Sequence, residues 1–193
     1  LFSCNNKKLT KVVEVPLPSK EEKMLIGSPE DVKAEDGTFK MVALPYSYEA
    51  LAPHIDALTM ELHYSKHYLT YTNNLNKAIA GTELDQLPIE DVLKKLDVSN
   101  ADLRNNAGGY YNHGLFWENM APKSSGKPKD SLAIAINRDF GSFESFQNQF
   151  EEAASKQFGS GWAWLVTNKA GKLQITSRSE ERRVGKECSS PCR

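Results

Sequence analysis

Three side chains in one short segment have the types and the spacing that a metal site needs. His63, His67 and Tyr71 follow one another at intervals of four residues, so a helix would place them on one face, about one turn apart. Neutral imidazole is the commonest protein ligand for redox-active metals. A further histidine, His113, lies in a second segment rich in aromatic residues. The two segments together predict a metal held between two helices.

The spacing of His63 and His67 alone leaves other interpretations open. One helix can hold a zinc ion through two histidines four residues apart, as in zinc hydrolases. Zinc proteases place glutamate directly after the first histidine as the general base, and Tyr64 stands there instead. Two partly buried structural histidines are the other alternative. His54, which follows Pro53 near an expected helix start, is interpreted as a surface or capping group.

Composition excludes several classes of partner. The chain of 193 residues has 24 basic and 25 acidic residues and a formal net charge of -1, so no bulk basic surface points to nucleic acid. No apolar run is long enough to span a bilayer. The cysteines, Cys4, Cys188 and Cys192, stand near the two ends. Their positions argue against a disulfide framework for the core and against a cysteine zinc site.

Hydrophobic periodicity predicts a helical first half and a mixed second half. Apolar residues recur at helical spacing early in the chain, and the period changes to that of strands later. The expected elements are helices at residues 56–80, 88–96, 101–120, 132–137 and 143–155 and strands at 161–167 and 172–176. This order predicts an α+β fold, in which a long N-terminal helical hairpin precedes an α/β domain with a small antiparallel sheet.

Changes in composition suggest where the domains begin and end. Residues 1–42 are interpreted as a lipobox-like start and a polar tether, because so few apolar residues cannot bury much surface. The helical hairpin domain is expected at 43–122. A hinge rich in proline and serine opens a partial α+β domain at 123–177, and residues 178–193 are expected to form a separate tail.

Two adjacent glycines, Gly108 and Gly109, stand inside the second expected long helix. An interior glycine costs a helix about 1 kcal/mol relative to alanine. We therefore expect another group of the protein to approach the helix backbone closely at this point.

The chain from about Leu44 to about Ser177 resembles the iron/manganese superoxide dismutases. The motifs that carry the resemblance are Leu44-Pro-Tyr46, Met60-Glu-Leu-His63 with Lys66-His67 and Tyr71, Asn105-Asn-Ala-Gly-Gly109, Asn112-His113 with Phe116-Trp117, and Phe158-Gly-Ser-Gly-Trp162 with Trp164. The resemblance implies an enzyme that converts superoxide to dioxygen and hydrogen peroxide by redox cycling of one manganese or iron ion per subunit. It also implies a homodimer with metal sites near the interface.

The same resemblance assigns roles to individual residues. His63 and His113 correspond to two of the family's four protein ligands, which are three histidines and one aspartate. Tyr71 resembles the gateway tyrosine that relays protons, and His67 resembles the histidine near the substrate channel and the dimer contact. The remaining aspartate and histidine ligands have no counterpart in this sequence, since no histidine follows His113.

The tryptophans and Gly109 add to the expected site. Trp162, together with Trp117 and Trp164, resembles the aromatic wall around the metal, although plain core packing would also explain these residues. Gly109 stands four residues before His113, as in manganese-type members, whereas iron-type members tend to have glutamine there. The resemblance therefore favours a manganese-type protein or one that accepts either metal.

The last residues depart from the family pattern after Ser177. The family continues into a third strand with Asp-x-Trp-Glu-His, whereas this chain continues with Arg178-Ser-Glu-Glu-Arg-Arg-Val-Gly-Lys-Glu-Cys188, the translation of a common sequencing-library adapter. We hypothesise that residues 178–193 are not native, with a genuine basic tail as the alternative. The chain is then expected to be a fragment that binds metal weakly and has little or no activity.

The first residues predict an exported protein. Leu1-Phe2-Ser3-Cys4 precedes a polar tract and resembles a bacterial lipobox, in which the cysteine is lipidated. We expect a periplasmic or membrane-anchored lipoprotein, with an ordinary cysteine and a cytoplasmic location as the alternative. A non-catalytic surface lipoprotein that keeps the fold is a further alternative, and the joint presence of His63, Tyr71, His113 and Trp162 argues against it.

Overall fold

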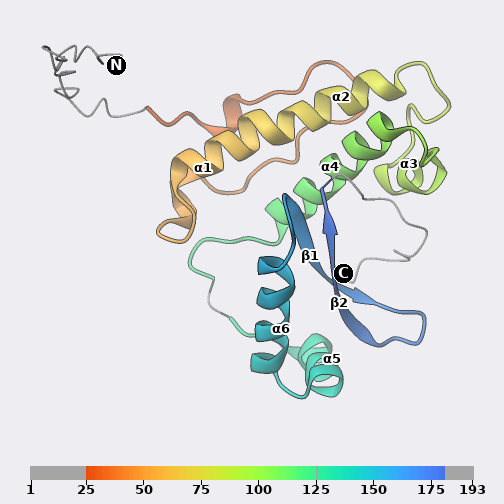
Figure 1. The fold of residues 1–193 in the computed structure, drawn as a ribbon. Helices are drawn as coiled ribbons and strands as arrows, with labels where there is room; N and C mark the ends of the chain where they lie inside the picture. Colours follow the sequence, from red (N-terminus) through yellow and green to blue (C-terminus); the bar gives the residue numbers. More distant parts are fainter. Residues whose placement is uncertain (1–24, 125, 181–193) are drawn as a thin grey trace, which may run out of the picture.

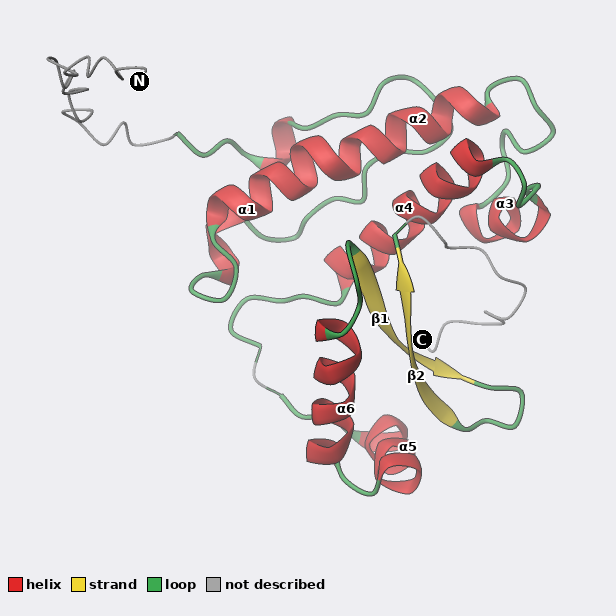
Figure 2. Cartoon of the chain, viewed as in Figure 1, coloured by secondary structure: helices red, strands yellow, loops and turns green. Residues whose placement is uncertain are grey.

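The described residues, 25–124 and 126–180, form a helical N-terminal half and a mixed C-terminal half in this computed structural model. The helical half comprises η1 (Pro29–Asp31), η2 (Tyr48–Leu51), α1 (Ala57–Leu62), the π-helical turn η3 (His63–Tyr68), α2 (Leu69–Ile79), α3 (Ile89–Lys95) and α4 (Ala101–Glu118). The mixed half comprises α5 (Asp130–Phe140), α6 (Phe143–Ser155), β1 (Gly161–Thr167) and β2 (Leu173–Ser179). Figures 1 and 2 show the two halves meeting where the strands approach α4, which confirms the expected α+β class.

One continuous helical run, α1–η3–α2, forms the first arm of the hairpin. The Asp56 carboxylate caps its start by accepting the Thr59 N–H at 2.9 Å. Gly81 follows its end with φ 70°, a left-handed conformation that glycine adopts without steric cost. The π-helical turn in the middle was not predicted, because a 3.6-residue period does not reveal one wider turn. Such turns occur frequently at functional sites, and this one carries His63 and His67.

Two buried clusters hold the helical half together. The apolar cluster consists of Phe39, Leu75, Ile79, Val92, Leu96, Leu103 and Ala107. The aromatic cluster consists of Tyr46, Tyr48, Met60, Tyr64, Tyr68 and Trp117. The aromatic cluster includes residues of η3 and α4, so the candidate site is built into its edge.

The segment 25–42 differs from the expected polar tether, because it packs along the first helical run. Asn76, buried in α2, accepts the Phe39 N–H at 2.8 Å and donates to the Phe39 carbonyl at 2.9 Å. Lys77 forms an ion pair with Glu35 at 3.0 Å. The polar composition of this segment did not reveal that it packs against α2. One aromatic side chain and a few polar contacts from α2 are enough to hold it there.

Within residues 25–180 as described, the sheet is one antiparallel hairpin. In its register, Gly161 pairs with Ser179 and Trp162 pairs with Arg178, so β2 continues three residues beyond its expected end. The turn closes at Gly171, with φ 73°, and Asn168 N–H donates to the Lys172 carbonyl at 2.9 Å. Helix α6 packs against both strands, as Figure 1 shows.

Two expectations fall largely outside the described residues. Cys4, the expected lipidation position, precedes residue 25, and residues 181–193 of the expected tail follow residue 180. Arg178 and Ser179 of that tail lie in β2, and Glu180 follows it. None of the described helices combines the length and the apolar character needed to cross a bilayer.

Candidate metal centre

Two histidines from different helices meet at the centre of the site. His63, in η3, and His113, in α4, bring their Nε2 atoms to 3.0 Å from each other. An ion at the usual metal–imidazole distance of about 2.1 Å can contact two nitrogens this far apart. The structure thus brings together the two residues that the sequence predicted as ligands, although they stand 50 positions apart.

Hydrogen bonding fixes the protonation of His113. Its Nδ1 lies 2.7 Å from the Gly109 carbonyl oxygen, which can only accept, so Nδ1 carries the proton. When the ring is neutral, Nε2 presents a lone pair toward His63. This arrangement, in which a backbone carbonyl orients the ring of a metal-binding histidine, is the usual one in metal sites.

The surroundings of His63 keep it neutral as well. Burial lowers its pKa from 6.5 to about 4, and the nearby His67 contributes to the shift. A charged imidazolium loses hydration in such a position. In their neutral forms, two imidazoles whose Nε2 atoms lie 3.0 Å apart form a donor set for a cation.

His67 and Tyr71 lie on the outer side of this pair. The His67 side chain is exposed, and its ring centroid lies 5.2 Å from that of His113 and 5.0 Å from that of Tyr71. Both residues line a surface pocket of about 380 Å³, whose other lining residues are Leu62, Lys66, Thr70, Asn74 and Asn106. His54, by contrast, is exposed in the turn before α1, as expected of a surface residue.

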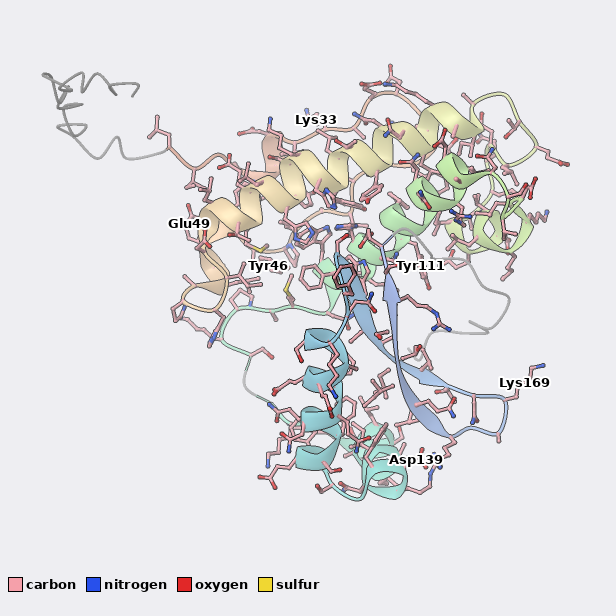
Figure 3. The ribbon with its side chains drawn as sticks, viewed as in Figure 1. Lys33, Tyr46, Glu49, Tyr111, Asp139 and Lys169 are labelled. Atoms are coloured by element: carbon pink, nitrogen blue, oxygen red, sulfur yellow. The ribbon has the colours of Figure 1, made fainter. Side chains whose placement is uncertain are left out.

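Aromatic rings surround the inner side of the histidine pair. Trp117 is fully buried, with its ring centroid 5.0 Å from that of His63. Trp162, in β1, lies edge-on to His113 at 5.0 Å and also contacts Phe116 at 5.2 Å. Trp164 is half-buried two residues further along β1, on the same face as Trp162 because strand side chains alternate. Figure 3 shows the side chains between α4 and the first helical run, with Tyr46 labelled.

Three contacts of the site were missed by sequence reasoning. Tyr68 is fully buried and stacks on His113 at 5.8 Å with an interplanar angle of 19°, but its position in a helix pattern made it look like ordinary core. Glu180 accepts a hydrogen bond from the Trp162 indole and was assigned to the tail. The contact of the Gly109 carbonyl cannot be predicted from the residue type, since every residue has a backbone carbonyl.

Tyr64 occupies the position at which a zinc protease needs a general base, and its surroundings argue against that alternative. Its ring is buried in the aromatic cluster, 2% exposed, and its hydroxyl donates to the Val42 carbonyl at 2.8 Å. A residue held in this way cannot activate water above the His63–His67 pair. A site at His63 and His67 therefore has no general base at position 64.

Further polar atoms of the site are unpaired among the described residues. Asn112 Nδ2 and Trp117 Nε1 are buried and find no hydrogen-bond partner there. Buried donors are nearly always paired in folded proteins, so these two are exceptions among the described residues. In residues 25–124 and 126–180, no group of three or more His, Cys, Asp or Glu side chains comes together as a complete metal site.

Comparison with known proteins agrees with this geometry. Residues 38–121 match the alpha-hairpin domain of the iron/manganese superoxide dismutases, and residues 128–191 match their C-terminal domain. An iron superoxide dismutase of Legionella pneumophila is 46% identical over 142 residues, which cover 74% of this chain and 72% of the relative. A manganese enzyme of Pseudomonas aeruginosa is 48% identical over 142 residues, or 72% of this chain and 70% of the relative.

A third relative extends the comparison. An iron superoxide dismutase of Raoultella planticola is 49% identical over 143 residues, which cover 72% of this chain and 84% of the relative. Both domains of the family match in their proper order, and the identities lie far above the level at which family membership is in question. The chain belongs to the iron/manganese superoxide dismutase family.

Proposed function

We propose that this protein is a superoxide dismutase that uses manganese or iron held by His63 and His113. The observation that carries the proposal is the approach of their Nε2 atoms to 3.0 Å, inside an aromatic cluster of a family member. Relatives named as iron and as manganese enzymes support either metal. A manganese or iron ion held there would supply a one-electron couple, through which one superoxide would be oxidised to dioxygen and the next reduced to peroxide.

The chain's own residues prepare the site for that chemistry. The Gly109 carbonyl holds the proton of His113 on Nδ1, which leaves Nε2 free to bind. The buried rings of Trp117 and Tyr68 exclude bulk water from the inner side, and Trp162 covers His113 from β1. A dry, fixed donor set needs little reorganisation when the charge of the ion changes.

The outer side of the site suits a small anion that must receive protons. Lys66, His67 and Tyr71 line the pocket that opens beside the histidine pair. A cationic side chain at such an opening attracts superoxide. The Tyr71 hydroxyl supplies a proton to the peroxide that forms, as a general acid, and His67 lies next to it at the mouth.

Metal binding by the full chain tests the proposal. Manganese or iron should bind weakly, because the described residues bring only two histidines to the ion, and superoxide consumption should be proportional to the metal bound. His63→Ala and His113→Ala should each abolish binding in equilibrium dialysis. His54→Ala, which changes an exposed histidine, is the matched control and should bind normally. Retention of metal by both site variants would refute the assignment.

We also propose that the protein forms a homodimer through the surface around His67. Support comes from Leu62, which is 50% exposed beside Lys66 and His67. Leu62→Glu should shift the sedimentation coefficient from dimer to monomer. A wild-type chain that sediments as a monomer at micromolar concentration would contradict the proposal.

Export with lipid attachment at Cys4 is a separate proposal. Its support is the order Leu1-Phe2-Ser3-Cys4 before a polar tract. Mass spectrometry of the N-terminal peptide from the native host would detect the added lipid, and an unmodified cysteine there would contradict it.

A further inference from the structure

Tyr68 and Tyr110 form a stacked pair that begins at His113. The Tyr68 ring lies nearly parallel to that of His113, with a centroid distance of 5.8 Å and an interplanar angle of 19°. The Tyr110 ring stacks on that of Tyr68 at 5.7 Å and 25°. A series of three rings in contact therefore connects a proposed metal ligand with a second tyrosine.

The two tyrosines also share a hydrogen bond. Their hydroxyls bond to each other, and Tyr110 donates its own proton to the Lys40 carbonyl at 3.0 Å, so Tyr68 is the donor within the pair. The Tyr68 oxygen accepts the Val42 N–H at 3.3 Å. A phenol hydroxyl can donate and accept at once, and these bonds hold both oxygen atoms in place.

Burial decreases along the pair. Tyr68 is fully buried, whereas Tyr110 is half-buried and the bond from its hydroxyl to Lys40 is exposed. Tyr64 and Trp117 also contact Tyr68, but they are 2% and 0% exposed and lead no closer to solvent. The pair thus runs from the interior of the site toward the surface.

This arrangement suits the transfer of a hydrogen atom between two phenols. A phenol that loses an electron becomes a strong acid, so its proton needs an acceptor within hydrogen-bond reach. If Tyr68 is oxidised to a phenoxyl radical, the O–H bond of Tyr110 can break and that of Tyr68 can form again. The electron then passes between the stacked rings and the proton passes between the hydroxyls, which leaves the radical on Tyr110.

We propose that Tyr68 and Tyr110 form a protective electron-transfer route, which carries oxidising equivalents from the metal centre to the surface. The oxidant rests on the proposed function: peroxide, its product, accepts one electron from a reduced iron ion and yields hydroxide and a hydroxyl radical. That radical takes a hydrogen atom from Tyr68 and becomes water. A soluble thiol returns a hydrogen atom to the Tyr110 radical and becomes a thiyl radical. His113 and Trp117 are thereby spared oxidation.

Trapping the radical in the iron-loaded full chain tests the route. Hydrogen peroxide and a nitroso spin trap are added, and mass spectrometry locates the adduct. We expect it at Tyr110 in the wild type and expect its loss in Tyr68→Phe, with more oxidation at Trp117. Tyr46→Phe, which removes a buried hydroxyl bonded to the Trp117 carbonyl at 3.0 Å, is the control and should keep the adduct. An undiminished adduct in Tyr68→Phe would mean that Tyr110 is oxidised directly from solution, which would overturn the proposal.

A second experiment needs no metal. Azide radicals made by pulse radiolysis oxidise accessible indoles, such as the half-buried Trp162, which contacts His113 at 5.0 Å. We expect the indolyl radical to decay to a phenoxyl radical, with a lower phenoxyl yield in Tyr68→Phe and in Tyr110→Phe than in Tyr46→Phe. Equal yields in the three variants would overturn the proposal. A chain that fails to bind iron would contradict the proposed function alone, and this experiment would still decide whether the route exists.

Discussion

Folding lowers the proton affinity of His63. Its pKa falls from 6.5 to about 4, first because of burial and second because of His67. Between these values the unfolded chain binds a proton that the folded chain does not, so the free energy of unfolding rises with pH. The stability that depends on neutral His63 is present above pH 6.5 and is lost as the pH falls toward about 4.

We therefore expect the metal-free chain to lose about 1–2 kcal/mol over this range from His63, a figure reduced for its partial exposure. Urea unfolding at a series of pH values measures the loss. In His63→Gln the same curve should be flatter, because glutamine does not titrate. Identical pH dependence in the two proteins would contradict this account.

At the residue scale, sequence predicted which histidines matter but not what state they are in. The spacing of His63 and His67 and the family motif at His113 were visible in the chain. The proton on His113 Nδ1 depends on the Gly109 carbonyl, and the pKa of His63 depends on burial. Both depend on tertiary packing, which cannot be read from the residue types alone.

Asp139 joins α5 to the start of β2, and it is labelled in Figure 3. Its carboxylate accepts hydrogen bonds from the Arg138 guanidinium at 2.8 and 2.6 Å and from the Leu173 N–H at 2.7 Å. The Arg138 bond first, and the Leu173 N–H second, lower its pKa from 3.8 to about 2. Its contribution to stability is present above pH 3.8 and is lost as the pH falls toward 2.

We expect Asp139→Asn to lower the Tm at neutral pH and to reduce the further loss of Tm on acidification. The reason is that asparagine can accept the Leu173 N–H but cannot pair with the Arg138 charge. Thermal scans from neutral to acidic pH measure both effects. Glu83→Gln, at an exposed position, is the control and should follow the wild type. A neutral-pH Tm equal to that of the wild type would show that the contact contributes nothing.

Asn76 fastens the N-terminal segment to α2 by bonding both backbone groups of Phe39. Asn76→Ala leaves a buried N–H and a buried carbonyl without partners, so we expect a loss of about 2–4 kcal/mol in denaturant unfolding. Asn73→Ala removes one exposed bond to the Glu35 N–H and should cost less than about 1 kcal/mol. Equal losses in the two variants would mean that the segment is not held at Phe39.

At the element scale, periodicity predicted every long helix and both strands. It missed the π-helical turn, because six residues of wider winding leave the apolar pattern on either side intact. It also missed the packing of residues 25–42, because Phe39 is a single apolar residue among polar ones. A segment that is held by a few specific contacts shows no hydrophobic periodicity in its sequence.

Trp162 connects the two halves of the molecule. It belongs to β1, yet its ring contacts His113 and Phe116 of α4 at 5.0 and 5.2 Å. We expect Trp162→Leu to weaken the coupling, so that unfolding followed by helix content and by the fluorescence of the remaining Trp117 and Trp164 no longer coincides. Phe158→Leu, at a position 96% exposed, should leave the two transitions together. Coincident transitions in Trp162→Leu would indicate that other contacts join the halves.

At the scale of the whole molecule, the class α+β and the helical hairpin followed from the order of the elements. The meeting of the halves at Trp162 did not, since Trp162 lies about 50 positions along the chain from His113, which it contacts, and nothing local connects them. The expectation that Trp162 lies near the histidines came from the family motifs and not from periodicity or composition. The composition of the tail likewise could not predict that β2 would continue through Ser179.

The paired bonds between Asn76 and Phe39 have a consequence for hydrogen exchange. The Phe39 amide lies in a segment without helix or strand, where amides ordinarily exchange within seconds, but its proton is held by a buried side chain of α2. Deuterium can replace that proton only when the segment detaches from the helix or the domain opens. Phe39 is therefore a built-in reporter, whose exchange rate relative to the amides of α2 reveals whether the N-terminal segment leaves before the helices unfold.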